Sequence, residues 1–417
     1  MNIHIFPYYG RNLDKSQIEM VERKGIGHPD TLADLIAETF SNKYSYFCFK
    51  KFGVIPNHWA DKVTLVGGKT KITFGKVELL QPIKIFQFGR MTPDIGKEII
   101  DINSIFKDSV IDVFSKVFGK KNDILKFLEF QVNVHDGCGP DHPKNFYDPQ
   151  SPEDIMKVHS SIRANDTVIC TSYAGYSKLE KIVIELENFL NSKKFKKEFP
   201  ETGYDIKILG IRLKKKITLV ICIPFIANFT PTFKYYEKKK KEILEIVNKK
   251  VREFLPEFEY SIHLNTKDRE KGSVYLTAFG TSLDKGGCGA VGRGNRYNGL
   301  IAPMRETPIE AYAGKNPVYH AGKLYHVAAF NISKNLFLNY SLENYINIIS
   351  FNGDVIQNPS FIFVKLCKQG FGLEKNIIDT INHEISHIEE YTGKIILRDP
   401  VKDHVNRPRE IYEERIK

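Results

Sequence analysis

Signals for disulfides and membrane spans are scarce in this sequence. Its 417 residues contain six Cys, which are scattered along the chain without a C-x-x-C pair, and no signal peptide opens it. This cysteine usage predicts a reduced, cytoplasmic protein. The longest apolar stretch, residues 217–229, is too short to cross a membrane and is interrupted by Thr218, Pro224 and Asn228. We therefore expect no membrane partner and interpret the stretch as a buried strand.

Tryptophan is also scarce, but other core-forming residues are not. The chain has one Trp against 29 Phe and 20 Tyr, with 42% hydrophobic and 27% charged residues. This is the balance of a soluble globular protein, so it excludes a disordered chain. The length predicts two or three structural units rather than one small binding module.

Positive charge is in excess. There are 61 Lys and Arg against 50 Asp and Glu, which gives a net charge of +11. The excess favours anionic partners such as nucleotides, polyphosphates or nucleic acid. The alternative is a set of solvated, lysine-rich helix faces. The run from Lys238 to Lys241 favours this alternative, because it precedes apolar residues at helical spacing.

Strand-like and helix-like segments alternate irregularly, without a repeat or a low-complexity linker, which predicts an α+β protein. Strands are expected at residues 63–66, 71–74, 128–134, 205–211, 217–223 and 273–279. The fourth and fifth should form a hairpin across three lysines. Helices are expected at residues 29–40, 176–189, 235–254 and 375–392. Boundaries are weak, and we place approximate unit limits at 1–150, 151–270 and 271–417.

A literal H-E-x-x-H occurs at His383, Glu384 and His387, the pattern with which zinc peptidases bind metal from one helical face. At about 100° per residue, however, both histidines fall opposite the apolar stripe and should face solvent. That stripe is predicted to consist of Ile378, Ile381, Ile385 and Ile388. A zinc peptidase is therefore the least favoured hypothesis.

Two further loops carry residues that could bind a metal or an anion. His135, Cys138, Asp141 and His142 could ligate a metal, but no second ligand pair is suitably spaced, so a structured polar loop is favoured.

The other loop, residues 287–292, matches G-x-G-x-x-G without the helix that should follow it. Its glycines would let backbone amides approach an anion, and Arg293, Arg296 and Lys315 could neutralise phosphates. The alternative is a plain glycine turn with exposed arginines.

The segment from Glu22 to Asp30 combines a glycine-hinged turn with a histidine at a predicted helix start. Pro29 suits the first helical position, and Asp30 and Asp34 share a helix face. Backbone amides at a helix start suit an anion, His28 can donate to an oxygen and Asp30 can hold Mg²⁺. A simple helix cap needs only one polar residue, so we interpret the segment as a site.

Seven segments of the chain occur together in one order. They are V-E-R-K-G-I-G-H-P-D-T-L-A-D from Val21, L-V-G-G from Leu65, A-N-D-T from Ala164, L-N-T-K-D from Leu264, Y-L-T-A-F-G-T-S from Tyr275, G-A-V-G-R-G-N-R-Y-N-G-L-I from Gly289 and A-G-K-N-P-V-Y-H-A-G-K from Ala313. In these segments the sequence resembles the archaeal S-adenosylmethionine synthase (methionine adenosyltransferase) family. The resemblance extends from residue 21 to about 330 and is loose beyond.

The resemblance implies a transferase that joins ATP to methionine. The thioether sulfur attacks the ribose C5′ and expels the triphosphate, which is then hydrolysed to pyrophosphate and phosphate. It also implies three similar α+β units with interleaved connections, and a homodimer with active sites between subunits. Mg²⁺ is the implied cofactor and K⁺ a second candidate ion, while nucleic acid is not an expected partner.

The resemblance also implies roles for individual residues. Those implied in catalysis are His28, Arg293 and Lys315, with Asp30 on Mg²⁺. Those implied in ATP binding are Glu22, Gly137, Gly139, Asp141, Asp166 and Lys207.

The chain departs from the family at two loops. Relatives usually carry Gly-Asp-Asp-Gly where this chain has Gly-Gly-Cys-Gly from Gly286, and one of those aspartates helps to hold the amino acid. The ATP loop, usually Gly-Gln-Gly, has Cys138 at its centre. Asp284 is a candidate replacement for the missing carboxylate. A nucleotide-binding paralogue with an altered substrate, or without catalysis, is the alternative hypothesis.

Overall fold

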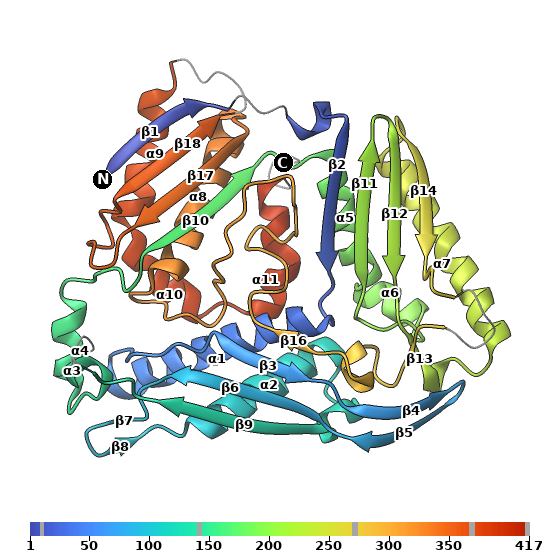
Figure 1. Cartoon of the computed structure of the whole chain (residues 1–417), viewed down its shortest axis with the longest axis horizontal. Helices are drawn as coiled ribbons and strands as arrows, with labels where there is room; N and C mark the ends of the chain where they lie inside the picture. The colour runs from blue at the N-terminus through green and yellow to red at the C-terminus, as the bar shows by residue number, and fades with distance from the viewer. Residues whose placement is uncertain (9–11, 140–143, 269–273, 367–371, 413–417) are drawn as a thin grey trace.

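The computed structural model describes all residues except 9–11, 140–143, 269–273, 367–371 and 413–417. Three four-stranded sheets face the same side of the molecule, with most helices behind them (Figure 1). Each sheet takes its strands from segments that are distant in the sequence.

The first sheet has the order β16-β3-β6-β9. Its strands are Gly289–Ala290, Lys62–Val66, Ile83–Arg90 and Leu128–His135. Helices α1 (Pro29–Phe52) and α2 (Ile102–Phe118) pack on each other behind it. The ring centroids of Phe40 and Phe106, one from each helix, are 5.1 Å apart in the core of this unit.

The second sheet has the order β14-β12-β11-β2. Its strands are Glu259–Leu264, Lys216–Cys222, Lys207–Leu213 and Ile18–Lys24. Helices α5 (Lys178–Leu190) and α7 (Phe233–Phe254) accompany it. The pairing of β11 with β12 confirms the predicted hairpin, with Lys214 in the left-handed region at its turn (φ 54°).

The third sheet has the order β1-β18-β17-β10. Its strands are Asn2–Pro7, Phe361–Leu366, Asn344–Ser350 and Val168–Ala174. Helices α8 (Ala321–Tyr340) and α9 (Glu374–Ser386) pack together behind it.

Smaller elements complete the described part of the chain. They are β4 (Lys69–Thr73), β5 (Lys76–Gln81), β7 (Asp94–Ile95), β8 (Glu98–Ile99), β13 (Phe225–Ile226), β15 (Leu276–Thr277), α3 (Lys144–Tyr147), α4 (Pro152–His159), α6 (Lys193–Glu198), α10 (Tyr391–Ile396), α11 (Pro400–Asn406) and short 3₁₀ turns.

The three sheets share one plan. In each, a central antiparallel pair carries one parallel edge strand and one antiparallel edge strand. A helix precedes each central pair and another follows it. This arrangement confirms the prediction of three similar α+β units with interleaved connections. The sheets cross the approximate limits at 150 and 270, because β1 and β2 belong to the third and second sheets while β16 returns to the first.

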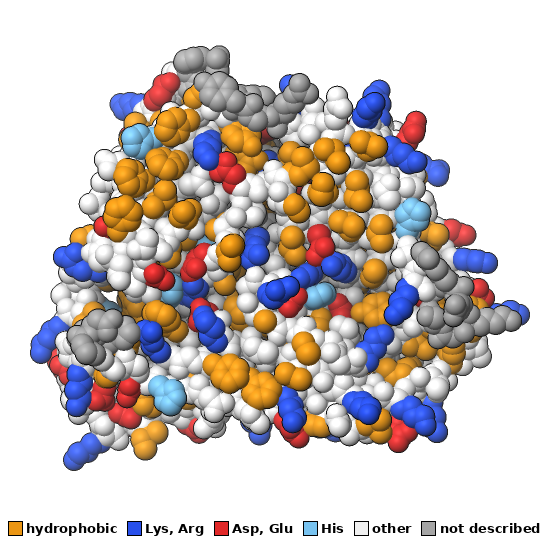
Figure 2. Space-filling view, in the orientation of Figure 1, with side chains coloured by type: hydrophobic (Ala, Val, Ile, Leu, Met, Phe, Trp, Pro, Cys, Tyr) orange, Lys and Arg blue, Asp and Glu red, His pale blue; other side chains and the backbone are white. Residues whose placement is uncertain are grey.

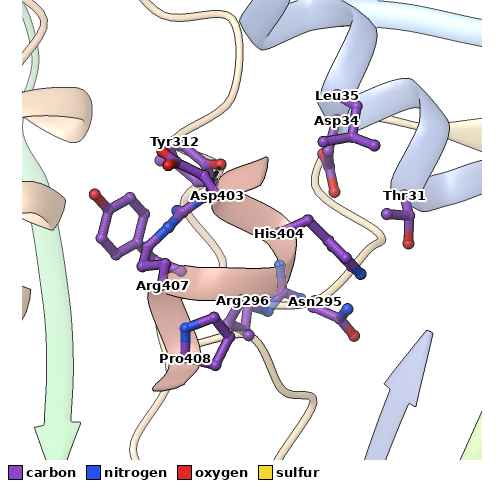
Figure 3. Close-up of a pocket in the computed structure, with 12 residues that line it drawn as sticks. Thr31, Asp34, Leu35, Asn295, Arg296, Tyr312, Asp403, His404, Arg407 and Pro408 are labelled. Carbon is purple, nitrogen blue, oxygen red and sulfur yellow. Dashed lines mark hydrogen bonds between the residues drawn. The ribbon is translucent and has the colours of Figure 1, made fainter. Parts of the chain in front are cut away.

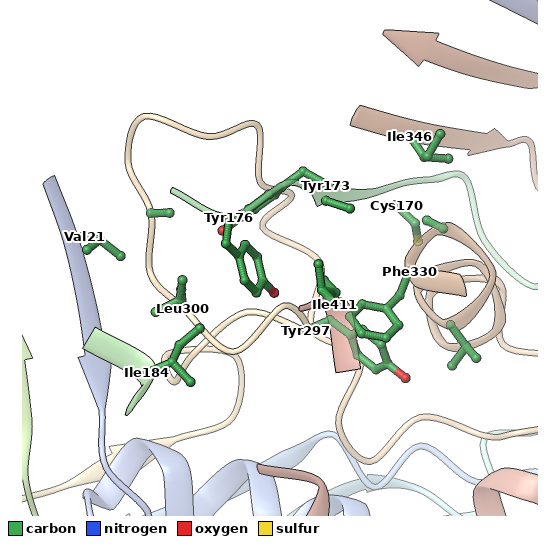
Figure 4. Packing of buried hydrophobic residues seen from close by; sticks show 14 of the residues in the cluster. Val21, Cys170, Tyr173, Tyr176, Ile184, Tyr297, Leu300, Phe330, Ile346 and Ile411 are labelled. Carbon is green, nitrogen blue, oxygen red and sulfur yellow. The ribbon is translucent and has the colours of Figure 1, made fainter. Parts of the chain in front are cut away.

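The largest core cluster joins the second and third units (Figure 4). Leu300 lies beside Val21 of β2 and Ile184 of α5, all nearly inaccessible to solvent. The rings of Tyr297 and Phe330 meet edge to face with centroids 5.3 Å apart. The segment that follows the glycine-rich loop is thus anchored in this core.

The predicted first helix is correct at its start but too short. Buried positions continue past Phe40 on the same face, at Tyr44 and Cys48, so the helix extends to Phe52. Gly53, in the left-handed conformation at φ 73°, ends it.

Two other predicted elements differ from the structure. The helix at 375–392 is wrong as one element, since α9 ends at Ser386 and α10 begins at Tyr391. Its buried stripe begins at Ile377, whereas Ile378 is 37% exposed. The strand at 273–279 is reduced to β15, and residue 273 lies outside the described residues.

The described cysteines are free thiols, at positions 48, 138, 170, 222 and 288. Cys367 lies outside the described residues. None of the helices in the described ranges has the length and hydropathy of a bilayer-crossing segment.

The cap of α5 gives a test of the fold. Ser177 Oγ accepts from the Glu180 amide, and Ser177 also donates to Glu19, all in a buried setting. We expect Ser177→Ala to lower the free energy of unfolding by roughly 2 kcal/mol, since a cap and a charged partner are both lost. Ser192→Ala, at the cap of the six-residue α6, should cost about half as much. Urea denaturation measures both, and equal costs would contradict the assignment.

Candidate active site

The turn at residues 25–28 is held by backbone contacts from the second unit. The Gly25 amide donates to the Ile206 carbonyl at 2.6 Å, and the Gly27 amide donates to the Tyr204 carbonyl at 3.0 Å. A Cβ atom on Gly27 would lie 2.6 Å from Tyr204 Cβ, so only glycine fits there. This packing fixes the direction in which α1 begins.

His28 caps α1, with Pro29 at the first helical position as the sequence predicts. Its Nδ1 accepts from the Asp30 amide at 3.2 Å. Burial lowers the pKa of His28 below its ordinary value of 6.5, and Asp205 and Asp30 only oppose this change. A neutral ring whose Nδ1 accepts must carry its proton on Nε2. His28 can therefore donate from Nε2 to an oxygen atom.

Asp30 joins the start of α1 to the glycine-rich loop. Its Oδ1 accepts from the Ala290 amide at 3.1 Å, and its Oδ2 accepts from Lys24 Nζ at 3.0 Å. Lys24 Nζ also donates to the Arg293 carbonyl at 2.7 Å. The structure therefore brings together the His-Pro-Asp segment and the loop that carries Arg293, which are distant in the sequence.

The glycine-rich loop has a different structure from a dinucleotide-binding turn. The strand β16 is two residues long, and turns rather than a helix follow it. Gly289 packs directly on the Pro29 carbonyl, where a Cβ atom would not fit. The side chain of Arg293 is exposed and makes no hydrogen bond or ion pair with the described residues. An exposed guanidinium thus belongs to a residue whose backbone contacts Lys24.

Asp34 holds the glycine-rich loop through a hydrogen bond. It lies one helical turn beyond Asp30 in α1, and its Oδ1 accepts from the Gly292 amide at 2.8 Å. Burial raises the pKa of Asp34 to about 7. A cavity of about 40 Å³ lies beside it, between the loop and α11 (Figure 3). Asn295, Arg296, His404 and Arg407 are among the side chains around this cavity.

Lys315 belongs to a second group of charged residues. Its Nζ pairs with Glu310 and lies 3.9 Å from Asp61 Oδ2. Burial lowers the pKa of Lys315, and Asp61 opposes this. Asp61 precedes β3, and Ala290 pairs with Thr64 on the same strand. Both groups therefore adjoin β3 or the residue that precedes it.

The loop with Gly137 connects to this second group. A Cβ on Gly137 would lie 2.7 Å from Arg90 Cδ, and the Arg90 guanidinium lies 4.6 Å from the centre of the Trp59 ring. Trp59 in turn forms a backbone bridge with Lys315. Gly139 is exposed, and Asp141 and His142 lie outside the described residues.

Asp166 is exposed at the edge of the second group. Its Oδ1 accepts from the Thr167 amide at 2.8 Å, and its charge acts to raise the pKa of Lys315. It is therefore close to Lys315 without forming an ion pair with it among the described contacts.

Glu22 and Lys207 form a pair on neighbouring strands. Lys207 Nζ lies 3.2 Å from Glu22 Oε2, and the backbone of Glu22 bridges to Ile301. Asp205, two residues before Lys207, accepts from Tyr275 Oη at 3.2 Å and from the Ser282 amide at 2.9 Å. Asp205 was not predicted from the sequence as a site residue, although it lies two residues before Lys207 in the segment D-I-K. Lys24 and Asp34 lie in or next to the predicted site segment, but their contacts with the glycine-rich loop were not predicted.

Asp284 is fully buried, and its Oδ2 accepts from the amides of Ala278 and Phe279, both at 2.7 Å. Burial raises the pKa of Asp284 to about 7. Its Oδ1 has no hydrogen-bond partner among the described residues but is buried, so contact with a substrate ammonium would require the surrounding segment to open. Its predicted role in amino-acid binding stays a prediction.

Positions 287 and 288, where relatives usually have aspartates, differ in the space available for a side chain. A Cβ on Gly287 would lie 2.7 Å from the Ser282 carbonyl oxygen, whereas Cys288 is exposed. A carboxylate at 287 would therefore require this loop to shift, and one at 288 would not.

The H-E-x-x-H residues are not joined by further candidate ligands within the described ranges. His383 and His387 are exposed, as predicted, and His387 Nδ1 lies 2.7 Å from the His383 carbonyl. Glu384 accepts from Asn335 at 2.9 Å and pairs with Tyr391. Across the described part of the chain, no three His, Cys, Asp or Glu side chains are grouped as metal ligands.

Comparison with known proteins identifies the family. The model of the S-adenosylmethionine synthetase (AdoMet synthetase) family matches residues 1–399. The chain belongs to this family. It is 36% identical to an S-adenosylmethionine synthase of Hyperthermus butylicus, over 92% of this chain and 96% of the relative. It is 34% identical to one of Aeropyrum pernix, over 95% and 98%. Membership confirms the prediction of a transferase.

A solved structure supports the same fold. An unusual S-adenosylmethionine synthetase from Campylobacter jejuni matches with a TM-score of 0.55 at 13% identity, covering 95% of this chain and 99% of that one. The S-adenosylmethionine synthetase fold thus persists where little sequence identity remains.

Asp34 gives a pH-dependent prediction. Its pKa in the folded chain, about 7, lies above the ordinary value of 3.8. At pH values between these two, Asp34 keeps its proton in the folded chain and has lost it in the unfolded chain. Stability should fall as pH rises from 3.8 to about 7, by on the order of 4 kcal/mol. Asp34→Asn keeps an acceptor for Gly292 and removes the titration. Its unfolding free energy relative to the parent should rise from pH 5 to pH 8 in denaturant titrations, and a constant difference would contradict the assignment.

Proposed function

We propose that this chain makes S-adenosylmethionine from ATP and L-methionine. The thioether sulfur attacks C5′ of the ribose, the C5′–O5′ bond breaks and triphosphate leaves. Water then hydrolyses triphosphate to pyrophosphate and phosphate. This chemistry needs alignment of sulfur with C5′ and neutralisation of the leaving group more than it needs covalent help from the protein.

The proposal rests on the contact between the His-Pro-Asp segment and the glycine-rich loop at the start of α1. Asp30 accepts from the Ala290 amide while Lys24 donates to the Arg293 carbonyl. One small region therefore presents helix-start amides, the Nε2–H of His28 and the exposed guanidinium of Arg293. These are donors and cations of the kind that bind a polyphosphate.

The triphosphate would extend from this region toward Lys315. Both groups adjoin the same part of the chain, because Asp61 precedes β3 and Ala290 pairs with Thr64 of that strand. In this arrangement His28 lies at the oxygen that leaves C5′, Arg293 neutralises one end of the triphosphate and Lys315 the other. Glu22, Lys207 and Asp166, together with the loop of Gly137, Gly139 and Asp141, bind the rest of ATP.

Asp30 fits a role in holding Mg²⁺. Mg²⁺ in phosphate sites is bound by one or two carboxylates and by the phosphates, not by a protein cage. Asp30 is 13% exposed, and its protein contacts leave lone pairs for a metal. When bound, Mg²⁺ would neutralise charge on the triphosphate. K⁺ is a further candidate ion for the same anionic complex.

A homodimer with active sites between subunits is part of the proposal. Figure 2, in the orientation of Figure 1, shows hydrophobic side chains gathered over all three sheets, around a central charged region. The strands of these sheets carry exposed apolar residues, among them Phe6, Met20, Phe88, Ile169 and Leu213. A second copy of the chain would cover this face and close the site against water.

A second candidate is a nucleotide-binding relative with a changed amino-acid substrate or without turnover. Gly287 and Cys288 favour it, because they stand where relatives usually have aspartates. Incubation with ATP, Mg²⁺ and methionine, followed by mass spectrometry of the nucleoside and phosphate products, separates the candidates. ATP binding without a sulfonium product would favour the second.

The phosphate cations give one prediction. Arg293→Ala and Lys315→Ala should each lower kcat by roughly 10²–10³, the effect of removing one oriented charge-stabilising donor. Lys62→Ala is the matched control, because this lysine pairs with Asp61 but is 60% exposed. Steady-state kinetics with saturating substrates measure the change. Unchanged kcat in both variants would remove these residues from the mechanism.

Asp30 gives another prediction. Asp30→Asn keeps an acceptor for the Ala290 amide but loses the charge that favours a divalent cation. The Mg²⁺ concentration for half-maximal activity should rise, by roughly tenfold or more, while the melting temperature changes little. An Mg²⁺ titration and a thermal melt check both. If the Mg²⁺ dependence is unaltered, the carboxylate has another role.

Methionine binding should be weak compared with ATP binding. A substrate ammonium without its carboxylate partner loses on the order of 2–5 kcal/mol. Cys288→Asp restores a carboxylate at the exposed position and should lower the KM for methionine, whereas Cys288→Asn, of equal size and no charge, should not. Gly287→Asp should instead disturb the loop, because its Cβ would meet Ser282. Equal KM values for the Asp and Asn variants at 288 would contradict the prediction.

A further inference from the structure

A second pocket lies apart from the candidate active site. Its volume is about 460 Å³, and it is bounded by the end of α2, helix α6, the turn after β13 and the segment after β15. None of the residues to which the proposed reaction assigns a role lines it. Its size is that of a small-molecule site.

Part of this pocket is lined by aromatic and other apolar side chains, and the rest by polar ones. Phe118 and Tyr204 meet edge to face, with ring centroids 5.5 Å apart and planes at 89°. Phe279 and Ala278 form a buried wall, and Phe229, 54% exposed, stands at the rim. Such walls favour an aromatic or similarly flat apolar body.

Two lysines line the same pocket, the exposed Lys121 and Lys196 of α6. Lys196 Nζ donates to Thr202 Oγ1 at 3.2 Å and to the Gly203 carbonyl, and lies 5.0 Å from the centre of the Tyr204 ring. An ammonium has three donors, so one is left. Among the described residues no carboxylate lies within ion-pair distance of it.

The acids near Lys196 are otherwise engaged or distant. Glu187 and Glu201 act on its charge without contacting it, and Glu187 is paired with Arg23. At the rim, Asp123 is paired with Lys126 at 2.8 Å. The pocket thus offers a desolvated cation beside apolar walls, with no anion of its own in contact.

We propose that this pocket binds a small-molecule carboxylate with a flat apolar body, in addition to the substrates of the active site. The carboxylate pairs with Lys196 and accepts from its third donor, and the body lies against Phe118, Tyr204 and Phe279. A carboxylate fits better than a phosphate ester, because a single donor and a single charge suit a monoanion.

The test uses the full chain and two probes of the same shape. We choose 3-phenylpropionate and its uncharged amide, and measure both by titration calorimetry at pH 6.5. The acid should bind at least roughly tenfold more tightly than the amide. Lys196→Met should abolish this preference, whereas Lys197→Met, on the exposed neighbour, should keep it. Equal binding of acid and amide by the parent, no saturable binding of the acid up to about 10 mM, or an unchanged preference in Lys196→Met would overturn the proposal.

A measurement on the parent protein does not depend on how the variant folds. Burial lowers the pKa of Lys196 to about 7. The charges of Glu187 and Glu201 act in the opposite direction but do not cancel this effect. The carboxylate needs the protonated amine, so its apparent Kd should rise about tenfold per pH unit above pH 7. The amide should show no such change. Lys121, Asp123 and the Tyr204 ring also line this pocket. Lys121 is exposed, so burial does not act on it as it does on Lys196. A Kd for the acid that stays constant from pH 7 to pH 9 would overturn the proposal.

Discussion

The candidate active site depends on a backbone-to-backbone contact that side chains would prevent. Gly25 and Gly27 donate to carbonyls of Ile206 and Tyr204, and Thr281 Oγ1 donates to the Gly27 carbonyl. The turn before α1 is therefore held by the second unit and by the segment before the glycine-rich loop. Amides at a helix start bind an anion only where the helix is fixed in position. Here the fixing is done by main-chain atoms, which leaves the side chains of the turn free for chemistry.

Buried ion pairs hold the layer behind this turn. Arg23 Nε lies 2.8 Å from Glu187, and Arg23 also donates to the His404 carbonyl at 2.9 Å. Burial would raise the pKa of Glu187, but Arg23 and His404 hold it below its usual range. Arg305 pairs with Glu180 at 2.6 Å in the same way. Removing one partner of such a pair is costly because it leaves an unpaired buried charge. These pairs join strand β2, helix α5 and helix α11 into one support.

The sequence predicted well what depends on local pattern and poorly what depends on packing between units. Pro29 after His28 predicted the start of α1, but its end required the buried face from Tyr44 onward. Motif order predicted the family and the residues near the start of α1. It could not predict that Asp34 and Lys24 hold the loop at Gly292 and Arg293, because these contacts span more than 250 residues. The space at Gly287 is likewise set by Ser282 and by nothing in the motif itself.

The pairing of β1 with β18 has a consequence for the order in which the protein is built. These strands pair in parallel from Asn2 with Phe361 to Pro7 with Leu366. At typical translation rates of about 5–20 residues per second, the first strand leaves the ribosome roughly 20–70 s before its partner is made. Until then its edge has no native partner. The third unit is thus the last to be completed, and the nascent chain must keep its N-terminal strand from pairing elsewhere in the meantime.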